Sequence, residues 1–238
     1  VRLWDHSLLA CRFAQDRIRE AYPNLQVEIA TQPSPADDGE DVTVLVSHAL
    51  NELTLEAQNT LTGQLRQAAQ ILFVEPGDYA ASRLLIKQRE ALAGDFDIVA
   101  PCTHCQQCPM LETENGSHWC HFFGKPPLEA FTEGVWASFA QVMEIDLRSL
   151  PYSFLVLNHK RLAAPETPPS GSSRLIGRPR QFKGYTRLLS CDEKGLRDLE
   201  LQKRDDKTLW KSLKKAKDGS LFAWESVESG RLARGRPL

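Results

Sequence analysis

Strand-like and helix-like segments alternate along the first hundred residues, and this alternation is the strongest constraint on the fold. Continuous apolar runs of strand length occupy 1–5, 25–30, 42–48, 71–77 and 96–101. Amphipathic stretches of helical length lie between them, at 6–22, 49–69 and 79–94. Strands that are apolar on both faces and separated by helices are typical of a parallel sheet covered by helices. The sequence therefore predicts an α/β core.

The rest of the chain does not continue this alternation of strands and helices. Strand character returns at 151–159, 184–191 and 196–205, and a basic helix is expected at 207–217. We expect loops at 31–41 and at 160–181, which are rich in Pro, Gly and polar residues, and a flexible basic end over the last ten residues. Because no helix separates 151–159 from 184–191, these two strands are expected to pair antiparallel.

Charge is divided unequally along the chain, although the formal net charge is only −2. Residues 1–150 hold 10 Lys and Arg against 21 Asp and Glu, whereas residues 151–238 hold 19 against 10. A basic region joined to an acidic body is typical of proteins that contact nucleic acid. No apolar run reaches about 18 residues and no signal or transit segment opens the chain, so we expect no membrane span and no secretion.

Six cysteines occur, and four of them fall in one short stretch: Cys102, Cys105, Cys108 and Cys120. In a reducing compartment, clustered cysteines are typical of metal sites rather than disulfides. The spacing Cys-x2-Cys-x2-Cys-Pro resembles the start of a bacterial ferredoxin motif and favours an iron–sulfur cluster. Tetrahedral zinc bound with His104, His118 or His121 is the alternative. Spacing alone also leaves open a cysteine cluster that binds no metal.

Six short motifs occur in an order shared with one known family. They are SHALNEL at 47–53, ILFVEPG at 71–77, IVAPC at 98–102, the cysteine segment ending in Trp-Cys-His-Phe at 119–122, PYSFLVL at 151–157 and GRPRQFKGYTRLLSC at 177–191. Together they resemble the mitochondrial and bacterial small-ribosomal-subunit methyltransferase-like family, which contains an iron–sulfur cluster. The resemblance covers about residues 5–225.

This resemblance implies a [4Fe–4S] cluster as cofactor, with Cys102, Cys108, Cys120 and Cys191 as its ligands. Cys105 lies where the family usually carries another residue, and Thr103 replaces the usual proline after the first ligand. These departures leave room for Cys105 to substitute for a neighbouring ligand. Cys11, in a helical pattern far from the others, is expected to pack in the core.

The resemblance also implies a class I methyltransferase-like (Rossmann-like) sheet with a cysteine-rich metal-binding insertion and a basic C-terminal extension. In that fold an acid at a strand end binds the ribose of S-adenosylmethionine, and Asp5 occupies that place. The alternative is an aspartate that only caps the following helix.

The first strand and glycine-rich loop of that fold would precede Asp5. We therefore expect this chain to lack the first strand, and to bind S-adenosylmethionine only if a missing N-terminal part is present. Whether the protein is an enzyme is left open, and no catalytic residue is assigned. The expected parts are a partial core at 1–101, an iron–sulfur insertion at 102–150, the final sheet strands at 151–193 and a basic extension at 194–238.

The basic half supplies candidate RNA-binding residues, namely Arg174, Arg178, Arg180, Lys183, Lys211, Lys214 and Lys215. Cationic side chains neutralise phosphates, and the neighbouring Phe182 and Tyr185 can stack on unpaired bases. The alternative for the helix at 207–217 is that Trp210 and Leu213 pack inward while its lysines are merely solvated.

The predicted function is association with the small ribosomal subunit and its rRNA, in ribosome assembly and translation. One alternative is an active S-adenosylmethionine-dependent rRNA methyltransferase, and another is a zinc-binding nucleic-acid module. The expected location is the cytoplasm of a bacterium or the mitochondrial matrix of a eukaryote.

Overall fold

The computed structural model describes residues 1–31, 41–216 and 219–238. Its N-terminal half contains β1 (Arg2–Leu3), α1 (Leu8–Ala21), β2 (Glu28–Ile29), β3 (Thr43–Ser47), α2 (Leu55–Leu65), β4 (Gln70–Pro76), α3 (Tyr79–Leu92) and β5 (Phe96–Ala100). The cysteine segment contributes two 3-10 turns, Pro109–Leu111 and Thr113–Asn115, and β6 (Phe122–Gly124). The remaining elements are α4 (Glu129–Thr132), α5 (Gly134–Met143), β7 (Leu150–His159), β8 (Ser172–Gln181), β9 (Tyr185–Asp192), β10 (Gly195–Gln202), α6 (Lys207–Lys215), β11 (Leu221–Glu228) and β12 (Arg231–Pro237). The loop expected at 31–41 falls almost entirely outside the described residues.

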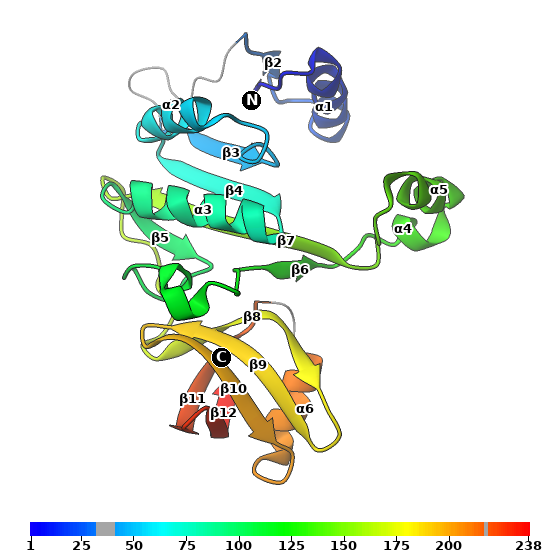
Figure 1. Ribbon diagram of the computed structural model, residues 1–238. Coiled ribbons are helices and arrows are strands. Elements are labelled where there is room, and N and C mark those ends of the chain that lie inside the picture. The colour runs from blue at the N-terminus through cyan, green and yellow to red at the C-terminus, as the bar shows by residue number, and fades with distance from the viewer. Residues whose placement is uncertain (32–40, 217–218) are drawn as a thin grey trace.

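The central sheet has the strand order β3-β4-β7-β5, and β6 pairs with Leu150–Tyr152 at the start of β7. β3 and β4 run parallel, whereas β7 runs antiparallel to β4, β5 and β6. In Figure 1, α2 and α3 lie over one face of this sheet. Apolar residues of the strands and helices form the core there, among them Phe73, Leu85 and Leu157. Burying such side chains contributes about 1.5–3 kcal/mol each.

Helix α3 begins where the sequence provides a cap. The Asp78 carboxylate accepts a hydrogen bond from the Ala81 amide at 2.8 Å, which satisfies one of the free donors of the first turn. The buried side of α3 contains Leu85, Ile86 and Leu92, but also the charged Arg89. This helix therefore presents a guanidinium group toward the cysteine segment below it.

The C-terminal part forms a second unit, a closed barrel with the strand order β10-β12-β11-β8-β9. Leucines such as Leu175, Leu188 and Leu199 fill it, and Leu209 and Leu213 of α6 are buried against the same core. The barrel lies directly below the central sheet (Figure 1). Fully buried positions alternate along β9 with positions that are only partly buried or exposed, as expected for a strand with one face in the barrel core.

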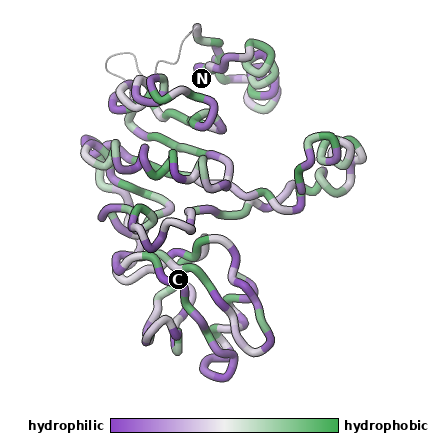
Figure 2. The backbone as a smooth tube through the Cα atoms, viewed as in Figure 1, coloured by the Kyte–Doolittle hydropathy of each residue, from purple (hydrophilic) through white to green (hydrophobic). Residues whose placement is uncertain are grey.

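A third feature is an arm in which β6 and β7 leave the sheet and lead to α4 and α5 (Figure 1). Helix α5 has the sequence GVWASFAQVM, without a charged residue, and none of its residues is buried. Figure 2 shows apolar residues along this helix pair, and Val142 is 80% exposed.

The expected Rossmann-like sheet of the class I methyltransferase kind, with a cysteine-rich metal-binding insertion and a basic C-terminal extension, is wrong. The central sheet is mixed, because β7 lies antiparallel between β4 and β5, and β1 and β2 form a separate two-stranded sheet. The expected extension closes into a barrel. Across the described ranges, no three His, Cys, Asp or Glu side chains form a group that could hold a single metal ion.

Three local expectations for the C-terminal region also fail. Strand β8 occupies Ser172–Gln181, where a loop was expected, and β12 occupies most of the expected flexible end. Strand β9 pairs with β8 and β10 rather than with β7. Pro, Gly and Arg residues in these segments resemble loop composition, but the long-range pairing of a barrel satisfies their backbone groups.

Candidate functional site

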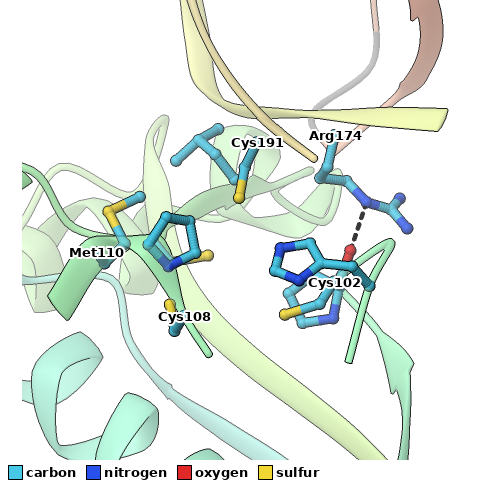
Figure 3. Close-up of a pocket in the computed structure, with 10 residues that line it drawn as sticks. Cys102, Cys108, Met110, Arg174 and Cys191 are labelled. Atoms are coloured by element: carbon cyan, nitrogen blue, oxygen red, sulfur yellow. Dashed lines mark hydrogen bonds between the residues drawn. The ribbon is translucent and has the colours of Figure 1, made fainter. Parts of the chain in front are cut away.

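A pocket lies between the central sheet and the barrel, and four of the six cysteines line it. Cys102 follows β5, Cys108 precedes the first 3-10 turn, Cys120 precedes β6, and Cys191 lies on β9 of the barrel. Figure 3 shows the sulfur atoms of Cys102, Cys108 and Cys191 turned toward a common space. The other lining residues are Pro101, His104, Pro109, Met110, Arg174 and Ile176. The structure thus brings together the four cysteines that the resemblance grouped.

The remaining cysteines lie elsewhere. Cys105 is exposed and does not line the pocket, although it belongs to the same loop as Cys102 and Cys108. Cys11 is buried in α1, where its thiol lies 3.9 Å from the carbonyl oxygen of Asp5. The compact trio suggested by spacing alone is therefore not the set that surrounds the pocket.

Hydrogen bonds from both sheet and helix fix the position of Cys120. Its amide donates to the Ser82 hydroxyl oxygen at 3.0 Å. Its carbonyl oxygen accepts from the hydroxyl groups of Ser82, at 2.9 Å, and Ser153, at 2.7 Å. Because Ser82 lies on α3 and Ser153 on β7, the backbone of this cysteine is held on two sides.

Arg89 and Glu90 of α3 hold the loop that carries the other two sheet-side cysteines. The Arg89 Nε lies 3.4 Å from the Cys102 sulfur, and its Nη2 donates to the carbonyl oxygens of His104 and Gln106 at 3.3 and 2.7 Å. Glu90 forms an ion pair with Arg89 and accepts the Cys108 amide at 3.1 Å. Sequence reasoning missed both residues. The available signal was that Arg89 shares the buried face of α3 with Leu85 and Leu92.

Arg174 connects the barrel to the sheet side of the pocket. Its Nε donates to the Pro101 carbonyl at 2.8 Å, drawn as the dashed line in Figure 3, and its Nη1 donates to the Gly219 carbonyl at 2.6 Å. This residue was predicted to bind RNA. The structure places it in the pocket wall, next to Cys102, rather than on the outer surface of the barrel.

Burial in the pocket wall favours the protonated thiol form of Cys108, Cys120 and Cys191. Burial raises the pKa of Cys108 to about 11 and raises the pKa values of Cys120 and Cys191 well above their usual range. The nearby Cys102 adds to each of these shifts. Burial would lower the pKa of Arg89, but Cys102 and Glu90 raise it overall. Binding of a metal to these thiols therefore requires the release of protons.

The histidines proposed as zinc ligands are dispersed. His104 lines the pocket, with both ring nitrogens buried and without a hydrogen-bond partner, and burial lowers its pKa. The His121 ring instead stacks on Trp119, with 4.8 Å between the ring centroids. Within the described part of the chain, no group of His and Cys side chains could hold one ion, so the geometry gives no support to a single zinc site.

Asp5, the expected cofactor-binding residue, follows β1 of the separate two-stranded sheet. Its carboxylate accepts a hydrogen bond from the Ser7 amide at 2.7 Å, and Ser7 is the N-cap of α1. This hydrogen bond therefore belongs to the start of α1. Binding of S-adenosylmethionine at Asp5 stays a prediction.

The other predicted RNA-binding residues lie on the surface of the barrel and of α6. Arg178 stacks over the Phe123 ring, with its guanidinium carbon 3.9 Å from the ring centroid. Arg180 lies 3.5 Å from an Asp198 carboxylate oxygen. The remaining predicted residues, Lys183, Lys211, Lys214 and Lys215, are exposed. RNA binding by these residues stays a prediction.

Replacing Arg89 is expected to release the loop between Cys102 and Cys108. We expect Arg89→Met to lower the free energy of unfolding by about 3–5 kcal/mol, because it leaves two partly buried carbonyl groups and Glu90 without their partner. Chemical denaturation of the purified chain measures the change. Lys87→Met is the matched control, because Lys87 lies on the same helix but is exposed. Equal effects of the two substitutions would contradict a specific role for Arg89.

The fold and the pocket define a class of protein in which a mixed α/β unit is joined to a closed five-stranded barrel through a cysteine-lined pocket. The family model described as mitochondrial small ribosomal subunit Rsm22 matches residues 12–223, and the chain belongs to this family. The family expected from the motifs is thereby confirmed, and membership supports a ribosome-related role. No curated protein matches the chain. Among the described helices, none is long and apolar enough to cross a membrane.

Proposed function

We propose that this protein associates with the small ribosomal subunit as an assembly factor, that a [4Fe–4S] cluster joins its sheet to its barrel, and that its barrel contacts rRNA. The single observation that carries the proposal is the convergence of Cys102, Cys108, Cys120 and Cys191 on one pocket between the two units. The family described as a mitochondrial small ribosomal subunit component supports the ribosomal partner and, for a eukaryotic source, the mitochondrial matrix.

The donor set fits a four-iron cluster better than a single ion. Four thiolates are the usual ligands of such a cluster, and each binds a different iron atom, so the sulfur atoms surround a body larger than one ion. Arg89 and Arg174 lie at the pocket and offset the negative charge of the thiolates. When bound, the cluster would supply a cross-link between the units and a centre able to exchange one electron.

The chain's own residues explain why such a link would matter. Three of the cysteines belong to the sheet unit, and Cys191 belongs to the barrel. The Arg174 hydrogen bond to the Pro101 carbonyl and the Gly177 amide hydrogen bond to the His121 carbonyl already join the two units. A fourth thiolate ligand on β9 would fix their orientation further. The basic residues of the barrel would then face the ribosome in a constant orientation.

The test is to purify the chain without oxygen, measure its metals, and sediment it with small ribosomal subunits. We expect about four irons and four sulfides per chain. We also expect sedimentation with the subunit that weakens steeply as salt is raised, because phosphate contacts release counterions. Stoichiometric zinc without iron would reject the cluster, and a chain that stays in the supernatant at low salt would reject the ribosomal association.

A further inference from the structure

The connectivity of the barrel identifies its type. Numbered from β8 to β12, its strands follow the closed order 1-2-3-5-4, strands 3 and 5 are parallel, and α6 lies between strands 3 and 4. This is the arrangement of the OB fold, a small barrel that binds oligonucleotides with the face of strands 2 and 3 and with the loops that join strands 1–2 and 4–5. The corresponding elements here are the β9–β10 face and the β8–β9 turn.

One end of this face is already covered in the protein. Leu189, Cys191 and Leu196 pack against residues of the cysteine segment, among them Met110 and Phe122. They occupy the end of the β9–β10 face that lies next to the sheet (Figure 1). A nucleic acid can therefore reach the opposite end, where the β8–β9 turn spans Gln181–Tyr185. We call this segment the aromatic hairpin.

Two aromatic rings are displayed on the aromatic hairpin. Phe182 and Tyr185 stack in parallel, with ring centroids 4.6 Å apart and an interplanar angle of 7°. The Phe182 amide donates to the Tyr185 carbonyl at 2.9 Å, and Gly184 adopts φ +96°, a conformation that permits the tight turn. Phe182 is 44% exposed, so the pair presents an aromatic surface to solvent.

Cationic residues lie in the aromatic hairpin and in the segments beside it. Lys183 is exposed within the turn, and the Lys203 amide donates to the Gly184 carbonyl at 2.8 Å, which places the segment with Lys203 and Arg204 beside it. Arg187 lies on β9, 3.5 Å from a carboxylate oxygen of Glu200. Lysines beside an exposed aromatic pair provide phosphate contacts next to a stacking surface.

We infer that the aromatic hairpin binds unpaired RNA by stacking a base on the Phe182–Tyr185 pair while neighbouring lysines contact the phosphates. A duplex hides the faces of its bases, so it would gain only the electrostatic part of this interaction. The mixture of Arg180 and Arg187 with Asp198 and Glu200 on the adjacent strands also interrupts any long positive track that a duplex would need. This inference rests on the proposed rRNA contact and specifies that the RNA bound at the aromatic hairpin is unpaired.

The test compares binding of a short single-stranded RNA and of its duplex to the full chain by fluorescence anisotropy. We expect tighter binding of the single strand, and about ten-fold weaker binding after Phe182→Ala, with duplex binding unchanged. Phe182→Trp should retain single-strand binding and serves as the informative variant if the alanine variant is unstable. Phe139→Ala is the matched control, because Phe139 on α5 is 43% exposed but far from the barrel.

Unchanged single-strand affinity in Phe182→Ala, or equal loss of single-strand and duplex binding, would overturn the inference. Loss of single-strand binding in Phe182→Trp equal to that in Phe182→Ala would also overturn it, because stacking requires only an aromatic ring. These results are separate from the ribosomal test. A chain that sediments with the subunit but shows no dependence on Phe182 retains the proposed function and loses only the aromatic hairpin.

Discussion

Cys191→Ser is expected to remove the iron from the anaerobically purified chain, whereas Cys105→Ser is expected to retain it. Cys191 lines the pocket from the barrel strand β9, and Cys105 is an exposed residue outside the pocket. A serine hydroxyl is a poor substitute for a soft thiolate ligand of iron. Iron and sulfide analysis together with visible absorption measures the outcome.

The same substitution should also affect stability, because the pocket joins two units. Metal binding to a folded site contributes directly to the free energy of folding. We expect Cys191→Ser to lower this free energy by about 3 kcal/mol or more, which corresponds to roughly 6–12 °C in Tm for a chain of this size. Cys105→Ser should unfold within about 2 °C of the parent, because surface substitutions usually change stability little. Iron retained by Cys191→Ser and lost by Cys105→Ser would show that Cys105 is a ligand instead.

The positions of the strands and helices in the central sheet could be predicted from the sequence, because their signals are local, but the predicted sheet type was wrong. Apolar runs such as 71–77 are buried on both sides of a strand, and helices such as α3 carry their own caps and apolar faces. The direction of β7 had no such signal. A strand that is buried on both faces reads the same whether it runs parallel or antiparallel to its neighbours.

The barrel could not be predicted in this way, because its strand pairing depends on long-range contacts. Strand β8 contains Gly177 and Pro179, a composition that predicts a loop, although the segment pairs with β9 and β11. Those partners are distant in the sequence, and no local pattern reveals their pairing. The last strand, β12, carries three arginines, which resemble a solvated tail until Leu232 is seen to enter the barrel core.

The sequence could likewise predict only some of the residues of the candidate site. Spacing grouped Cys102, Cys105 and Cys108, because these lie close together in the sequence, while the ordered motifs grouped Cys102 and Cys108 with Cys120 and Cys191. The structure shows why the second grouping surrounds the pocket: the loop turns Cys105 outward, and the barrel brings Cys191 in. The contributions of Arg89 and Arg174 depend on contacts between elements, so the sequence alone could not assign them.

Gly177→Ala is expected to disrupt the junction between barrel and sheet. Gly177 has φ +62°, and an added Cβ would lie 2.7 Å from Nε2 of His121. The His121 ring cannot move aside at low cost, because it stacks on Trp119 and meets the edge of Phe123 with 5.5 Å between the centroids. The Gly177 amide also donates to the His121 carbonyl at 2.9 Å, so the two backbones are held close together.

Gly171→Ala provides the matched control for this junction. Gly171 also has a positive φ, +77°, but an added Cβ there would meet no atom within 4 Å. Both variants incur about 1–2 kcal/mol of left-handed backbone strain, and only Gly177→Ala adds the clash. We expect Gly177→Ala to lose about 3 kcal/mol or more in denaturation and to retain less iron, since Ile176 and Cys120, the neighbours of the two clashing residues, line the pocket. If both variants retain iron equally, close approach of barrel and sheet at Gly177 is not what holds the four cysteines together.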